Sequence, residues 1–205
     1  GLTGLFLGNV TVDLPLSDTY FVVGHFHMVM GVSPILVVFG AIYHRYPKIS
    51  GRMWNERLGK AHFWLTFLGT YAIYLPMHYL GILGVPRRYY ALGDTAFIPD
   101  SVHSINAAIT IAALIVAAAQ VIFLYNMIVS LKKGAKAPPN PWKATTLEWQ
   151  TPDTPPHHGN WGPKLPVVHR WAYDYSVPGA KDDFIPQNEP VDPKLGAGRD
   201  HGKKH

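Results

Sequence analysis

The chain has 205 residues, a formal net charge of +5 and no cysteine, so structural disulfides and thiolate-ligated zinc, iron–sulfur or copper sites are excluded. Its mean hydropathy of +0.05 averages two unlike parts, because the residues up to about Leu131 are apolar and aromatic and those from Lys132 onward are rich in Pro, Gly, His and charge. The basic residues lie at the ends of apolar segments, which membrane topology explains better than nucleic-acid binding. The chain starts at Gly1, without an initiator Met, as a fragment or a processed chain would.

Three segments are long and apolar enough to cross a bilayer, which needs about 20 mostly apolar residues. They cover about residues 19–43, 58–85 and 102–131. Each must be helical, because only a helix satisfies its own backbone in hydrocarbon. The sequence therefore predicts an all-α membrane protein whose three transmembrane helices form part of a larger bundle, with Pro34 kinking the first helix.

The remainder, residues 132–205, reads as a separate Pro-rich extension of the membrane region 1–131. Proline at this density favours extended conformations, and the residues from 196 to 205 are expected to be disordered. His157 and His158, inside this extension, suit a surface role better than a metal site.

The loop charges predict an orientation. Basic residues are concentrated between the first two segments and after the third: Arg45, Lys48, Arg52, Arg57, Lys60, Lys132, Lys133 and Lys136. The positive-inside rule then puts these parts on the cytoplasmic or matrix side of the membrane. The start of the chain and the loop with Arg87 and Arg88 face the opposite side.

The most informative residues are His25 and His27, which lie within the first apolar segment. Ionisable side chains at membrane depth are costly and usually functional. On a regular helix, positions i and i+2 point about 200° apart, so the two imidazoles cannot share one metal ion but can serve two centres. Neutral imidazole is an axial ligand of haem iron. Hydrogen bonding of both rings to neighbouring helices is the alternative that the spacing alone leaves open.

Several motifs resemble subunit I of the haem–copper oxidases, over the chain from Gly1 to about Val168. Residues 18–27 are similar to the tenth membrane helix of that subunit and read DTYFVVGHFH. Residues 62–67 and 76–81 resemble its eleventh helix, residues 84–89 the loop that follows, and residues 140–158 the C-terminal extension of bacterial members. The resemblance implies a catalytic subunit that reduces oxygen to water with electrons from cytochrome c and pumps protons.

The same resemblance assigns ligands and partners. It implies that His25 is the catalytic proximal ligand of a high-spin haem, that His27 is an axial ligand of a low-spin haem, and that both haems are A-type. Copper belongs to the complex without ligands from this chain. The expected partners are the polypeptide with the remaining haem and copper ligands, a copper-bearing subunit II, other oxidase subunits, cytochrome c and lipid, in a bacterial plasma membrane or a mitochondrial inner membrane.

The resemblance also implies that Arg87 and Arg88 bind the haem propionates, and guanidinium suits this role because it pairs with carboxylate in a bidentate geometry. Snorkelling of the pair at the membrane interface is the alternative. Asp18 is a candidate ligand for Mg²⁺ or Mn²⁺, although Ser17 stands where most relatives have a histidine ligand. A helix N-cap at Ser17–Asp18 is also compatible with the sequence.

Two other functions remain open at this point. A quinol oxidase or a nitric oxide reductase of the same superfamily would use the same histidine pair. A scaffold or assembly subunit without haem would keep only the helices. The remaining membrane histidines, His44, His62, His78 and His103, suit interfacial or hydrogen-bonded positions better than metal ligation.

Overall fold

A computed structural model describes residues 1–89, 99–152, 155, 161, 163–175, 177 and 180–190. The predictions for His157, His158 and residues 196–205 lie outside this part of the chain. The described residues contain only helices and three isolated β-bridges, and the all-α prediction is confirmed. The elements are α1 (Leu2–Leu7), α2 (Val10–Leu16), α3 (Tyr20–Phe26), the π-helix η1 (His27–Val32), α4 (Ser33–Ser50), α5 (Glu56–Ile82), α6 (Ser101–Lys133) and the 3₁₀ helix η2 (Leu147–Trp149).

Two helical stretches, Tyr20–Ser50 and Ser101–Lys133, are long and apolar enough to cross a membrane. The first extends past the predicted end at residue 43, because helix α4 continues to Ser50. Helix α5 has 27 residues and so measures about 40 Å, which is enough to span the hydrocarbon. Its histidines and threonines lower its hydropathy, and its passage through the membrane stays a prediction.

The disturbance expected at Pro34 takes the form of the π-helical stretch η1, which ends two residues before it. Proline has no N–H to bond to the carbonyl four residues earlier, and its ring collides with that carbonyl in a regular α-helix. Widening the preceding turn relieves the collision. The Ser33 hydroxyl donates to the Met28 carbonyl oxygen at 2.7 Å and occupies one acceptor of the widened stretch.

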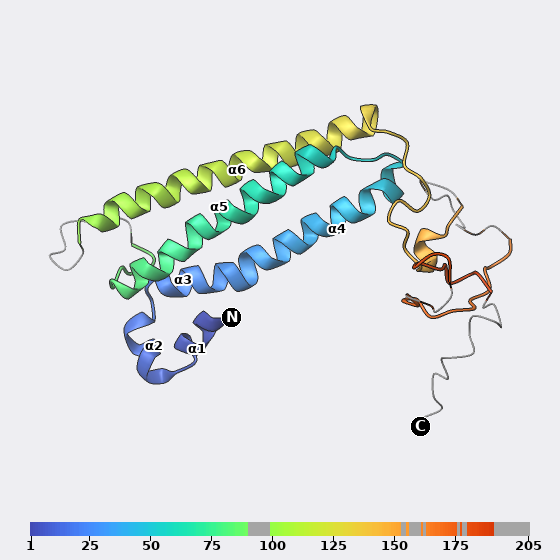
Figure 1. Ribbon diagram of the computed structural model, residues 1–205. Coiled ribbons are helices and arrows are strands. Elements are labelled where there is room, and N and C mark those ends of the chain that lie inside the picture. The colour runs from blue at the N-terminus through green and yellow to red at the C-terminus, as the bar shows by residue number, and fades with distance from the viewer. Residues whose placement is uncertain are drawn as a thin grey trace, which may run out of the picture. The chain divides into compact units, whose positions relative to one another are not determined.

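Helix α5 packs closely against α3 and also contributes, with α6, to the apolar core, and it runs beside both in Figure 1. The buried core residues are Ile73, Leu80, Val85, Val102, Ile109 and Ala112. A side chain on Gly81 would collide with the backbone of Phe21, and one on Gly24 would lie 2.8 Å from His78 Nδ1. Small residues of this kind let membrane helices approach closely. They place the histidine-bearing helix directly on α5.

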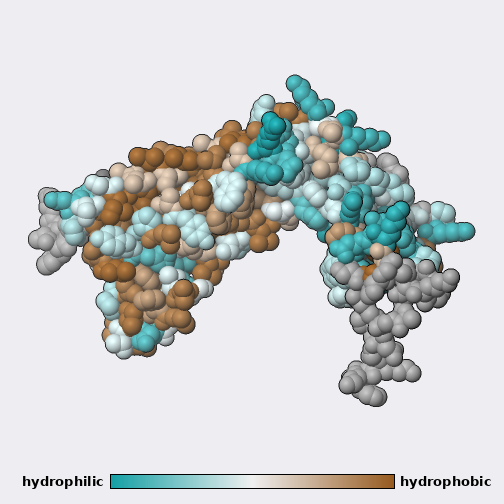
Figure 2. Space-filling model, in the orientation of Figure 1, coloured by the Kyte–Doolittle hydropathy of each residue, from teal (hydrophilic) through white to brown (hydrophobic). Residues whose placement is uncertain are grey.

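Much of the helical surface is apolar, and brown residues cover large parts of the helices in Figure 2. Large hydrophobic side chains on α4 and α6 stand exposed, among them Val37 at 71% and Leu114 at 66%. In a membrane such faces contact lipid or neighbouring helices. This agrees with a helical segment that belongs to a larger bundle.

The chain divides into two compact units, one of residues 1–43 and 55–129 and one of residues 44–54 and 130–205. In the second unit the buried Lys48 ammonium donates to the carbonyl oxygens of Pro139 at 3.3 Å and Thr151 at 3.4 Å. Arg45 pairs with Glu148 at 2.8 Å. Described residues of the extension therefore contact the end of α4.

We expect Gly81→Ala to destabilise the chain, because the new methyl group would collide with the Phe21 backbone. Overpacking of this kind costs about 1–3 kcal/mol. Gly40→Ala is the matched control, since a Cβ there meets nothing within 4 Å. Thermal unfolding of the assembled membrane complex should show a lower midpoint for Gly81→Ala only. Equal midpoints for both variants would contradict the close approach of α3 and α5.

Candidate haem-ligand site

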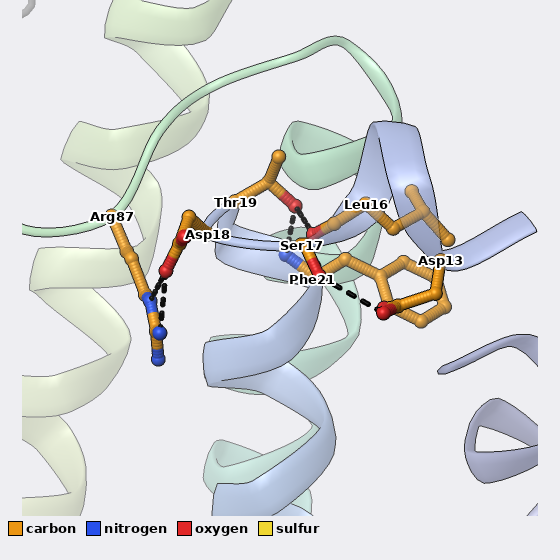
Figure 3. A network of polar contacts seen from close by, with 7 residues as sticks. All are labelled: Asp13, Leu16, Ser17, Asp18, Thr19, Phe21 and Arg87. Carbon is orange, nitrogen blue, oxygen red and sulfur yellow. Dashed lines mark hydrogen bonds and ion pairs between the residues drawn. The ribbon is translucent and has the colours of Figure 1, made fainter. Parts of the chain in front are cut away.

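The two predicted ligand histidines lie where α3 meets the π-helix η1. Thr19 caps this helix, since its hydroxyl accepts from Phe21 N–H at 3.2 Å and donates to the Leu16 carbonyl at 2.7 Å (Figure 3). Both imidazoles are half-buried, so part of each ring is open to a further group.

His27 is fixed through its Nδ1 atom, which lies 2.9 Å from the Val23 carbonyl oxygen. A carbonyl only accepts, so Nδ1 must carry the proton and Nε2 keeps a lone pair. The ring stacks on Tyr74 of α5, with centroids 4.9 Å apart and an interplanar angle of 10°. No described residue hydrogen-bonds to Nε2, so this atom can bind a metal ion.

His25 is held in a similar way from a different element. Its Nδ1 lies 2.7 Å from the Thr3 hydroxyl of α1, and a proton on Nδ1 again leaves Nε2 with a lone pair. A Cβ on Gly4 would lie 3.3 Å from His25 Cε1, so the ring rests close to the α1 backbone. None of the described side chains is hydrogen-bonded to Nε2 of this ring.

This donor set fits axial ligation of iron. Metal-binding histidines commonly donate their second nitrogen to a carbonyl or another acceptor, which fixes the tautomer and the ring orientation. His27 meets that condition through the Val23 carbonyl, and His25 meets it in the tautomer whose Nδ1 donates to the Thr3 hydroxyl. In these tautomers each ring offers Nε2 as a ligand. The described residues contain no cluster of three or more His, Cys, Asp or Glu side chains suited to holding a metal ion by itself. Each imidazole therefore suits a centre whose other ligands come from elsewhere, as in a haem.

A third imidazole, His78, adjoins this pair from α5. Its Nδ1 donates to the Tyr74 carbonyl at 2.7 Å, and its ring meets Phe21 edge-on with centroids 4.9 Å apart. Its Nε2 is buried and has no hydrogen-bond partner among the described residues. The prediction of a hydrogen-bonded histidine therefore holds for one of its two nitrogens.

Arg87 and Asp18, predicted for two different ligands, contact each other. Arg87 Nε and Nη2 donate to Asp18 Oδ1 at 2.9 and 2.5 Å, and Arg87 N–H donates to the Asp18 carbonyl at 2.8 Å (Figure 3). Asp18 has a φ of 60°, a left-handed conformation that Asp tolerates better than most residues. The N-cap expected at Ser17–Asp18 is formed by Thr19 instead, because Asp18 turns the chain and the Ser17 hydroxyl donates to Asp13 Oδ2 at 3.0 Å.

Arg88 is placed differently from its neighbour. It has a φ of 66°, lies exposed and makes no ion pair with the described residues. The two arginines therefore do not form one equivalent pair. Arg88 has its whole guanidinium available for an anion, whereas Arg87 is committed in part to Asp18.

Comparison with known proteins decides the family. The model of the family described as "Cytochrome C and Quinol oxidase polypeptide I" matches residues 1–115. The chain belongs to this family. It is 70% identical over 96% of its length to the alternative cytochrome c oxidase subunit 1 of Bradyrhizobium diazoefficiens, covering 33% of that protein. It is also 45% identical over 86% of its length to cytochrome c oxidase subunit 1 of Synechocystis, and 38% identical over 83% to the heme-copper oxidase subunit I+III of Aeropyrum pernix.

This result confirms the resemblance to haem–copper oxidase subunit I. The chain spans about a third of the Bradyrhizobium and Synechocystis relatives and a fifth of the Aeropyrum one, with 33%, 31% and 20% of their lengths covered. Membership implies haem and copper as the cofactors of the whole subunit and an integral membrane location. The ligand roles of individual residues rest on the geometry described above.

A polar network that sequence reasoning left unassigned connects three helices of this family member. His62, only 2% exposed, lies 3.2 Å from the Tyr43 hydroxyl through Nδ1 and 3.1 Å from Gln120 Oε1 through Nε2. Gln120 also donates to the Thr66 hydroxyl at 3.1 Å. Buried polar groups need such partners. The signal in the sequence is one polar residue on each of three apolar segments, but no spacing rule pairs them.

We expect Asp18 and Arg87 to be coupled energetically. Asp18 is 77% exposed, so the pair should contribute no more than about 1 kcal/mol. Asp18→Ala and Arg87→Ala should each lower the thermal midpoint of the complex, and the double variant should lower it by less than the sum. Asp18→Ala with Arg88→Ala should give additive shifts. Additive shifts for Asp18 and Arg87 as well would show that the contact is absent.

Proposed function

We propose that this chain is a C-terminal part of the catalytic subunit of a terminal oxidase, which reduces O₂ to water with electrons from cytochrome c and couples this to proton pumping. The observation that carries the proposal is the pair His25 and His27, each with Nδ1 bound to the protein and Nε2 free. The relatives named as cytochrome c oxidase subunits support the electron donor.

In this proposal His25 would hold the high-spin haem and His27 would hold the low-spin haem. When bound, the first would supply the site of oxygen reduction together with copper, and the second would supply electron transfer to that site. One residue, Phe26, separates the two histidines, so any groups that they hold would lie close together. The chain fixes this spacing by covalent structure, and Thr3 and the Val23 carbonyl orient the rings. Positioned groups of this kind need no rearrangement when electrons move.

Arg88 and Arg87 serve as partners of the haem propionates. They follow the end of α5, and Arg87 is bound to the residue that precedes the capped start of α3. The arginines and the histidine helix therefore meet at one end of the helices. Asp18 keeps Oδ2 for a Mg²⁺ or Mn²⁺ ion, but the Arg87 guanidinium on Oδ1 opposes a second positive charge there and lowers the affinity for the ion.

The proposed haem type is A, whose long apolar tail needs an apolar slot. A groove of about 300 Å³ lies between α4, α5 and α6, and its lining includes Tyr74, the residue stacked on His27. Its other lining residues are mainly apolar: Val32, Ile35, Leu36, Phe39, Ile73 and Val116, with Thr66, Thr70 and Gln120. Such a groove suits an isoprenoid chain better than a polar substituent.

The chain needs partners to complete both centres. The described residues hold no histidine trio for copper, and no second imidazole faces His27. We propose a complex with the polypeptide that carries the remaining ligands, a copper-bearing subunit II, other oxidase subunits and cytochrome c. A quinol oxidase is the second candidate, since the matching family includes quinol oxidases.

The proposed location is a bacterial plasma membrane or the mitochondrial inner membrane. The basic loop between α4 and α5 and the extension after α6 face the cytoplasm or matrix, and the Arg87–Arg88 loop faces the other side.

Replacing the histidines tests the ligand assignment. His27→Ala should remove the low-spin haem signal from the optical spectrum of the complex. His25→Ala should abolish oxygen reduction and alter the high-spin signal while the low-spin signal persists. His103→Ala is a control histidine at the start of α6 and should change neither. Normal haem content and turnover in both His25 and His27 variants would refute the assignment and favour a scaffold without haem.

Labelling of single cysteines introduced into this cysteine-free chain tests the orientation, with the unsubstituted complex as the background control. A membrane-impermeant maleimide added to intact cells should label Tyr89→Cys, since Tyr89 is 69% exposed beside Arg88. It should reach Lys136→Cys only after the cells are opened. The reverse pattern would invert the proposed topology.

A further inference from the structure

The hydrogen bond at Nδ1 holds the His27 ring in place but does not by itself define the plane of the ring. Rotation about the bond between Cβ and the imidazole is broad and has no sharp minima. The hydrogen bond from Nδ1 to the Val23 carbonyl decides which nitrogen faces away from the helix, but it tolerates rotation of the ring about that contact. A second contact must therefore define the plane of the ring.

Tyr74 supplies that contact from the neighbouring helix. Its ring is almost parallel to His27, with an interplanar angle of 10° and centroids 4.9 Å apart. Phe26 also adjoins His27, at 4.2 Å, but its plane is tilted by 32° and its side chain is 37% exposed. Of the two aromatic rings beside His27, Tyr74 is therefore the one that lies parallel to the imidazole and is less exposed than Phe26.

Tyr74 is itself held rigidly. It packs against the buried core that Ile73, Leu80 and Val85 form with α6. Its carbonyl accepts from His78 Nδ1 at 2.7 Å, and His78 is buried against Phe21 of the histidine helix. A Cβ on Gly31 would lie 3.2 Å from His27 Cδ2, so the glycine leaves that side of the ring uncrowded and Tyr74 remains the parallel surface against it.

The plane of an axial imidazole has a spectroscopic consequence. The ligand p orbital of the ring overlaps the iron d orbitals along one direction of the porphyrin, so the ring plane sets the splitting of those orbitals. In a low-spin ferric haem with two imidazole ligands, this splitting sets the principal g values of the electron paramagnetic resonance spectrum. A ring held at one angle gives narrow features, and a ring free to turn gives shifted and broadened ones.

We propose that Tyr74 is a positioning residue that fixes the plane of the His27 imidazole and thereby the electronic state of the low-spin haem. This inference rests on the proposed function, because it requires His27 to be the axial ligand of that haem. Tyr74 does not touch the iron and acts only through the ring of His27. The aromatic face, rather than the phenol hydroxyl, is the part that matters.

The test compares variants in the purified, fully oxidised oxidase complex, with haem content measured in parallel. Tyr74→Leu removes the flat surface and should shift and broaden the low-spin g features while the high-spin signal stays unchanged. Tyr74→Phe keeps the stacking face and should restore the wild-type features. Tyr71→Leu is the matched control, because Tyr71 lies one turn earlier on α5 and packs on Phe67 at 5.0 Å rather than on His27.

Each outcome decides the proposal. Unchanged low-spin features in Tyr74→Leu, an equal shift in Tyr71→Leu, or failure of Tyr74→Phe to restore the features would overturn it. If Tyr74→Leu does not assemble, Tyr74→Met fills the same space with a flexible chain and must show the same shift. The His27→Ala variant distinguishes failure of the proposed function from failure of the role proposed for Tyr74. A low-spin signal that survives in His27→Ala refutes the proposed function, whereas one lost there but unaltered in Tyr74→Leu refutes only the role of Tyr74.

Discussion

The hydrogen bond at Nδ1 of each histidine is the interaction on which the account of this chain depends. A free imidazole in an apolar helix would be a costly polar group with two possible tautomers. Here the Val23 carbonyl and the Thr3 hydroxyl bind one nitrogen of each ring, and the other nitrogen is left as a ligand. The cost of placing an imidazole at membrane depth is offset when that second nitrogen binds iron.

The helices around this pair serve to keep the two rings in place. Close packing at Gly81 brings α3 against α5, and α5 in turn offers Tyr74 and His78 to the histidine helix. At one end of the same helices Arg87 joins Asp18, and the backbone pair Tyr20 N–H to Val85 carbonyl, at 3.0 Å, closes the contact. The helix with the two histidines is thus fixed at its capped start and along its side, so that the two imidazoles have a defined direction.

The sequence was sufficient to predict the long helices and to single out His25 and His27 as ligand candidates, for physical reasons. Apolar length and loop charge determine membrane helices, and two histidines at spacing i, i+2 cannot share one metal ion. It was not sufficient for the contacts between distant segments. Nothing in the local pattern pairs Arg87 with Asp18, 69 residues away, or His27 with Tyr74, because such pairs depend on how helices pack. The short helices α1 and α2 were missed as well, although α1 brings Thr3 to His25.

The central claim is that His25 and His27 each present Nε2 to a separate haem iron. The direct measurement is an experimental density map of the whole oxidase complex, at a resolution that shows imidazole rings and both haems. The account predicts Nε2 of His25 on one iron and Nε2 of His27 on the other, with Nδ1 of each ring still bonded to Thr3 and to the Val23 carbonyl. Coordination through Nδ1, a shared metal ion, or a histidine that contacts no iron would contradict it.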